Sequence, residues 1–69
     1  MKLEIGYGLE TYGTVESTGN GFSYAGENPD ALRNLIESMQ ELQSAPKDPE
    51  DFLLFVKQRL ISRTWAKAV

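Results

Sequence analysis

The sequence predicts an α+β fold: a three-stranded antiparallel β-meander followed by an antiparallel two-helix hairpin packed on one face (βββαα). All six glycines and most threonines precede residue 27, a composition typical of short strands and tight turns. The rest of the chain has no glycine, and two stretches each open with an Asn-Pro or Asp-Pro step that favours a helix start. We therefore expect a single domain over 1–69, with the meander over 1–26, the first helix over 28–43 and the second over 48–67.

The three strands are predicted from alternation and turn residues. Residues 2–7 alternate polar and apolar, as a half-buried strand does. Gly8-Leu9 suits a two-residue turn with glycine at its first central position. Residues 10–17 supply a second strand rich in threonine, tyrosine and valine, and residues 22–25 supply the third.

The turn between the second and third strands determines which side chains face the core. A three-residue loop at Gly19–Gly21 places Glu16 opposite Tyr24, whereas a two-residue loop turns the aromatic residues to the other face. We prefer the three-residue loop because it gives one consistent apolar face. That face consists of Leu3, Ile5, Tyr12, Phe22 and Tyr24. The opposite face, open to solvent or to a second copy, then carries Lys2, Glu4 and Val15.

Both helices have clear start signals. Asn28 and Asp48 are good N-caps, and a proline follows each at the first helical position. The apolar stripe of the first helix consists of Leu32, Leu35, Ile36, Met39 and Leu42. The short connection over residues 44–47 predicts that the second helix returns antiparallel. No glycine or proline stops the second helix before residue 67.

The second helix carries more apolar side chains than one face can hold. One broad arc consists of Leu53, Leu54, Leu60, Ile61, Trp65 and Ala68. Phe52, Phe55 and Val56 fall largely on the other side, beside basic residues spaced by four, Arg59, Arg63 and Lys67. Either the sheet and the first helix bury the first turns, or Phe52, Phe55 and Val56 form an exposed contact patch. Trp65 likewise either closes the core or anchors an interface.

Size and composition limit the possible functions. A chain of 69 residues buries only about 60% of its unfolded surface, and small scaffolds often need disulfides, a metal or a partner subunit. The sequence has no cysteine and no histidine, which excludes disulfides, thiolate metal sites and the commonest acid–base catalyst. No phosphate-binding glycine loop or calcium loop is recognisable. We therefore expect no enzyme activity, no cofactor and no metal. Of the usual supports, tight helix packing or self-association is left, and a homo-oligomer is one of these two expectations.

Charge is unevenly distributed along the chain. Residues 1–51 hold ten acids and three bases, a net of −7, whereas residues 52–69 hold four bases and no acid, a net of +4. Helix dipoles account for part of this asymmetry, and the rest predicts a basic end that meets an acidic partner. The longest apolar run has five residues, far below the roughly 20 that span a bilayer, and we expect a soluble, cytoplasmic protein.

We interpret the chain as a small non-enzymatic protein-interaction domain that binds a second copy of itself or another protein. The alternative is a nucleic-acid-binding module that uses the basic C-terminal helix, which the acidic overall balance disfavours. We expect no membrane and no small-molecule partner. The residues expected to contact the partner are Phe52, Phe55, Val56, Arg59, Arg63, Trp65 and Lys67.

Overall fold

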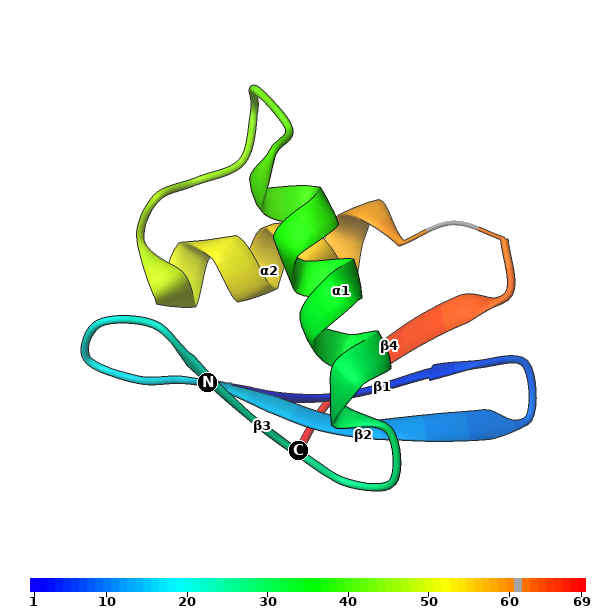
Figure 1. Ribbon diagram of the computed structural model, residues 1–69. Coiled ribbons are helices and arrows are strands. Elements are labelled where there is room, and N and C mark those ends of the chain that lie inside the picture. The colour runs from blue at the N-terminus through cyan, green and yellow to red at the C-terminus, as the bar shows by residue number, and fades with distance from the viewer. Residues whose placement is uncertain (61) are drawn as a thin grey trace.

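The computed structural model describes residues 1–60 and 62–69 and shows an α+β fold, with a four-stranded antiparallel sheet beneath two helices (Figure 1). The strands are β1 (Lys2–Tyr7), β2 (Glu10–Ser17), β3 (Phe22–Ala25) and β4 (Thr64–Ala68), and the helices are α1 (Pro29–Gln40) and α2 (Pro49–Arg59). The strand order in the sheet is β3-β2-β1-β4. The predicted α+β class is confirmed, and the meander gains a fourth strand that the sequence analysis did not predict.

The first hairpin follows the prediction and contains one irregularity. Tyr7 pairs with Glu10 across a two-residue turn at Gly8-Leu9. Farther along, Ile5 pairs with Gly13 and Gly6 with Thr11, so Tyr12 is an extra residue in β2. Such a bulge increases the local twist of the sheet.

The predicted register between β2 and β3 is wrong by one residue. Val15 pairs with Tyr24 and Ser17 with Phe22, so the loop has four residues and is closed by a bond from Thr18 N–H to the Gly21 carbonyl (2.8 Å). The bulge at Tyr12 shifts the alternation of β2 by one residue, so Val15 pairs with Leu3 and points into the core, where it is fully buried. Val15 therefore does not lie on the open face as predicted.

The predicted second helix over 48–67 is wrong beyond Arg59. Leu60 is already extended, Ser62 has a left-handed φ of 60°, and Thr64–Ala68 pairs antiparallel with β1. Helix propensity is a weak preference that tertiary context overrides, and here the free edge of β1 offers the segment a full ladder of backbone bonds. Ile61, which the predicted helix included, lies outside the described residues.

Both helix starts are confirmed. The Asn28 side chain accepts a hydrogen bond from Ala31 N–H (3.1 Å), and the Asp48 side chain accepts one from Asp51 N–H (3.0 Å). Helix α1 ends at Gln40, three residues before its predicted end at 43. Leu42 is consequently half exposed and does not extend the apolar stripe.

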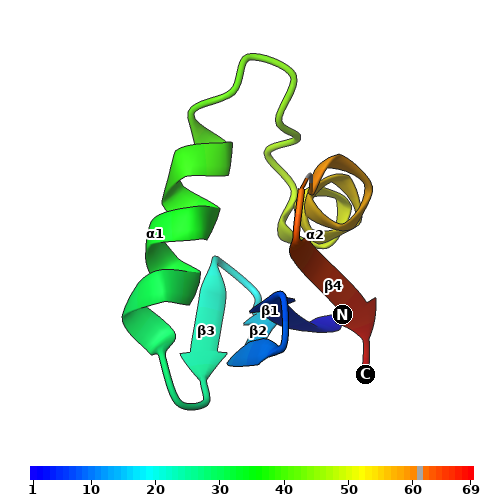
Figure 2. The same cartoon turned by 90° about the vertical axis from the view of Figure 1, so that its right-hand side faces the viewer.

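The two helices lie on the same face of the sheet, as predicted. They cross each other, since Figure 2 shows α2 nearly end on while α1 runs along the picture, so the predicted antiparallel arrangement of the two helices is not formed (Figures 1 and 2). Helix α1 contacts β2 and β3, whereas α2 contacts β1, β2 and β4. The sheet is thus covered on one face, and its other face has no helix or strand layer over it in the part of the chain that the structure describes (Figure 2).

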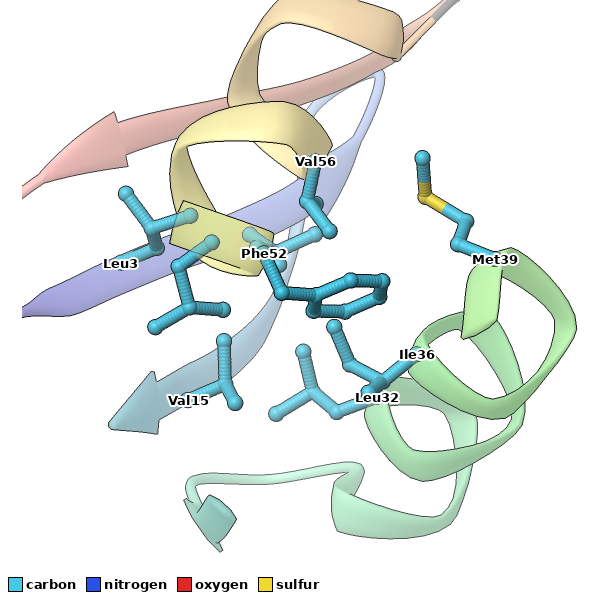
Figure 3. Packing of buried hydrophobic residues seen from close by; sticks show 9 residues of the cluster. Leu3, Val15, Leu32, Ile36, Met39, Phe52 and Val56 are labelled. Atoms are coloured by element: carbon cyan, nitrogen blue, oxygen red, sulfur yellow. The ribbon is translucent and has the colours of Figure 1, made fainter. Parts of the chain in front are cut away.

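The core lies between the helices and the sheet. Its buried residues are Leu3, Ile5, Val15, Leu32, Ile36, Met39, Phe52, Leu53 and Val56. Phe52 extends from α2 toward Leu32 and Ile36 of α1 (Figure 3), and its ring centroid lies 5.5 Å from that of Phe22. This one side chain therefore joins α2, α1 and the sheet.

We predict that Phe52→Ala lowers the free energy of unfolding by about 3–5 kcal/mol, because it removes a fully buried aromatic ring and leaves a cavity. Urea denaturation followed by circular dichroism measures this change. Phe55→Ala, on the same helix but only partly buried, serves as the control and should lose less. Equal losses for the two variants would contradict the packing described.

A polar cluster ties the start of β1 to α2. The Glu50 carboxylate accepts hydrogen bonds from the Met1 amino group and from Ser17 Oγ, the latter at 2.6 Å. These two bonds, the amino group first, lower the pKa of Glu50 below its ordinary value, and partial desolvation opposes them.

A carboxylate with a lowered folded-state pKa stabilises the fold above its unfolded-state pKa and loses that effect as the pH falls through the folded-state pKa. We therefore predict that Glu50→Gln is less stable than the parent protein at pH 7. The difference should shrink below the ordinary pKa of glutamate and vanish in stronger acid. Urea denaturation of both proteins between pH 7 and pH 2 tests this, and a difference that grows in acid would contradict it.

Candidate functional site

The uncovered face of the sheet is defined by strand alternation. Leu3, Ile5 and Val15 point into the core, so their neighbours along each strand point to the opposite face. With the observed pairings, the positions on that face are Lys2, Glu4, Gly6, Thr11, Thr14, Glu16, Ser23, Ala25, Trp65 and Lys67. Lys2 and Glu4 lie where the sequence analysis placed them.

Trp65 is the one aromatic residue on this face. It pairs with Gly6, and a Cβ atom built on Gly6 would collide with the indole ring, so the ring lies directly on the glycine backbone. The indole Nε1–H donates a hydrogen bond to the Gly8 carbonyl (3.0 Å). The ring is thereby fixed against the first hairpin and remains partly exposed.

Lys67 lies two positions along β4 on the same face. Its Nζ is 3.2 Å from Glu4 Oε1 and 5.9 Å from the centroid of the Trp65 ring. Exposed ion pairs and cation–π contacts each contribute about 0–1 kcal/mol, so these contacts orient the lysine more than they stabilise the fold.

A shallow hollow of about 750 Å³ lies beside Trp65 on the uncovered face. Glu4, Thr11, Thr14 and Ala25 form its floor, next to the bulge in β2. Its remaining lining residues are Leu9, Glu10, Tyr12, Gly13, Gly26, Glu27 and Asn28. Three carboxylates and no basic side chain line the hollow, and the Leu9 side chain at its rim is fully exposed.

The expected apolar contact patch on α2 is wrong for two of its three residues. Phe52 and Val56 are 1% and 0% exposed, because the sheet and α1 together cover the side of the helix that carries them. Phe55 is partly buried, and its ring centroid lies 5.9 Å from that of Phe52. The Arg59 guanidinium lies 5.0 Å from the centroid of the Phe55 ring. Of the predicted partner-binding residues that lie on α2, only Phe55 and Arg59 have exposed surface.

The expected basic ridge does not form on a helix. Arg59 is the last residue of α2, Arg63 lies in the turn before β4, and Lys67 lies in β4 beside Glu4. A spacing of four aligns residues only within one continuous helix or strand, and these three residues lie in a helix, a turn and a strand. Trp65 and Lys67 do lie together on the uncovered face, where Trp65 bonds to Gly8 of the first hairpin and Lys67 pairs with Glu4.

Sequence reasoning did not identify Leu9 or Gly6 as surface-forming residues. Leu9 was recognised only as part of a turn, although an apolar residue at a hairpin tip is itself unusual enough to note. Gly6 gave no signal, since its role depends on pairing with a strand that was predicted as helix.

Among the described residues, no group of three or more acids could hold a metal ion. Burial raises the pKa of the Tyr24 hydroxyl, as does the nearby Glu37 carboxylate, while Arg33 opposes the change.

In the described part of the chain, neither helix is long and apolar enough to cross a membrane.

Comparison of the chain with protein-family models, with curated proteins and with solved structures gave no match.

We predict that Gly6→Ala displaces the Trp65 ring, because the new methyl group would collide with both the indole and the Glu10 carbonyl. The expected cost is about 1–3 kcal/mol in the free energy of unfolding. Trp65 is the only tryptophan, so its fluorescence emission should move to longer wavelength. Gly19→Ala, where a Cβ meets no atom within 4 Å, is the matched control and should change neither quantity. An unchanged emission in Gly6→Ala would contradict the placement of the ring.

Proposed function

We propose that this protein is a small non-enzymatic interaction domain that binds another polypeptide chain through the uncovered face of its sheet. The observation that carries the proposal is the position of Trp65. A partly exposed tryptophan, held by a hydrogen bond on the face that no helix covers, is the kind of rigid anchor that dominates binding energy at interfaces.

The surroundings of Trp65 support the same proposal. Gly6 separates it from Thr11, which forms part of the floor of the hollow, so anchor and hollow are neighbours across β1. Leu9 adds an exposed apolar side chain at the rim. Besides Glu4, which is paired with Lys67, the hollow carries the carboxylates of Glu10 and Glu27, and these favour a partner segment that presents a basic side chain there.

The hydrophobic core does not compete for these residues. Trp65 and Leu9 lie outside the cluster that α1 and α2 bury against the sheet, so their contribution to folding is limited to local contacts. A partner can therefore cover them without rearrangement of the core, which is the usual behaviour of preorganised interfaces.

We predict that Leu9→Ser weakens partner binding at least about fivefold, the loss that corresponds to ~1 kcal/mol at an interface. The tagged protein is used to capture partners from extracts of the source cell. Captured proteins other than the chain itself are then titrated against the parent and the variant.

Leu42→Ser is the matched control, because Leu42 is also an exposed leucine but follows α1, away from the uncovered face. It should bind as the parent protein does. Partners that bind the parent, Leu9→Ser and Leu42→Ser equally would contradict a role for this face.

A further inference from the structure

The outer edge of β4 has a defined set of free backbone groups. The Gly8 N–H bonds to the Arg63 carbonyl and the Val69 N–H to the Lys2 carbonyl. Hydrogen-bonded and non-hydrogen-bonded pairs alternate along an antiparallel ladder. Odd-numbered residues of this segment therefore bond to β1, and the N–H and C=O groups of Thr64, Ala66 and Ala68 point away from the sheet.

These outward groups lack a neighbouring strand among the described residues, because β4 is the last strand in the sheet order. An edge of this kind is a template for another strand. Lysine on an edge often prevents such pairing, but Lys67 points to the uncovered face and its charge is paired with Glu4. The edge itself is left open.

Two copies of β4 can pair antiparallel in one register that uses the whole strand. In that register Ala66 faces Ala66 of the second copy, Thr64 faces Ala68, and Trp65 faces Lys67. In this register the outward N–H and C=O groups of Thr64, Ala66 and Ala68 lie opposite the same groups of the second copy, so every outward group has a hydrogen-bond partner. Shifting the register by two residues shortens the ladder and sets Lys67 opposite either Lys67 or Arg63, and like charges directly opposite one another are destabilising.

We propose that a second copy of this chain joins along β4 in the register centred on Ala66, to form a symmetric dimer with a continuous eight-stranded sheet. This inference goes beyond the proposed function, because the edge contact leaves Leu9 and the hollow free for the partner of the uncovered face. The two-fold axis is perpendicular to the sheet, so both pairs of helices lie on one side and the two uncovered faces join on the other. Each Trp65 ring then lies beside the Lys67 of the second copy, a cation–π pair on a non-hydrogen-bonded site where side chains approach most closely.

The register makes the contact self-complementary, as a two-fold interface requires. It also gives the small domain the additional support that its size calls for. A five-residue ladder buries less surface than a standard stable interface, so the dimer is expected to be weak and concentration-dependent.

Sedimentation equilibrium of the full chain from about 10 μM to about 1 mM, the upper limit of weak binding, tests the proposal. The weight-average mass should rise from 7.7 kDa toward twice that value. A mass that stays at 7.7 kDa at the highest concentration would overturn the proposal. In that case a partner whose binding depends on Leu9 would still support the proposed function, so the two can fail separately.

A proline substitution tests the edge. Ala68→Pro removes an N–H that points away from β1, at an exposed position where a sheet edge tolerates proline. It should weaken the dimer at least about tenfold while circular dichroism shows an unchanged fold. Ala68→Ser keeps the N–H and should dimerise as the parent does. Should Ala68→Pro unfold, Lys67→Glu provides the second variant, since it puts a carboxylate opposite Trp65 and should weaken the dimer by a similar factor.

Residue-resolved amide hydrogen exchange needs no variant. In dilute protein the amides of Trp65 and Lys67 should be protected and those of Ala66 and Ala68 should exchange fast. At high concentration the Ala66 and Ala68 amides should become protected as well. Association without this protection would place the second copy on another surface and overturn the proposal.

Discussion

The antiparallel pairing of β4 with β1 determines most of what is particular to this structure. It converts β1 from an edge strand into a central one, and it requires the chain to leave the helical conformation after Arg59. It also sets Trp65 over Gly6 on the face away from the helices, where the indole bonds to the first hairpin. Without that ladder, Trp65 and Lys67 would have no fixed position relative to β1 and the hollow.

The core accommodates the unusually apolar first turns of α2 within this small chain. Phe52, Leu53 and Val56 are covered because α2 lies across three strands and beside α1 at once. The excess of apolar residues in its first turns is therefore a packing feature and needs no external partner. On the uncovered face and its rim, the apolar side chains outside the core include the partly exposed Trp65 and the fully exposed Leu9.

Charge is distributed differently in space than along the chain. The four bases of residues 52–69 are divided between α2, the following turn and β4, and Lys67 is compensated by Glu4 from the opposite end of the sequence. The carboxylates Glu4, Glu10 and Glu27 converge on the hollow although they come from three separate segments. The charge distribution on this face thus arises from the fold, and the net charge of a segment does not predict it.

Local signals in the sequence determined the first two strands and their turn, the two capped helix starts and the α+β class, because each depends on residues close together in the chain. Three features depended on tertiary structure: the bulge in β2 that turns Val15 inward, the end of α2, and the strand at 64–68. The segment around Trp65 contains no helix breaker, and its strand conformation is decided by the vacant edge of β1, whose residues lie some sixty positions earlier. The pattern of residues in a short window cannot reveal that constraint, because the strand at 64–68 is stabilised by hydrogen bonds to β1, which is distant in the sequence.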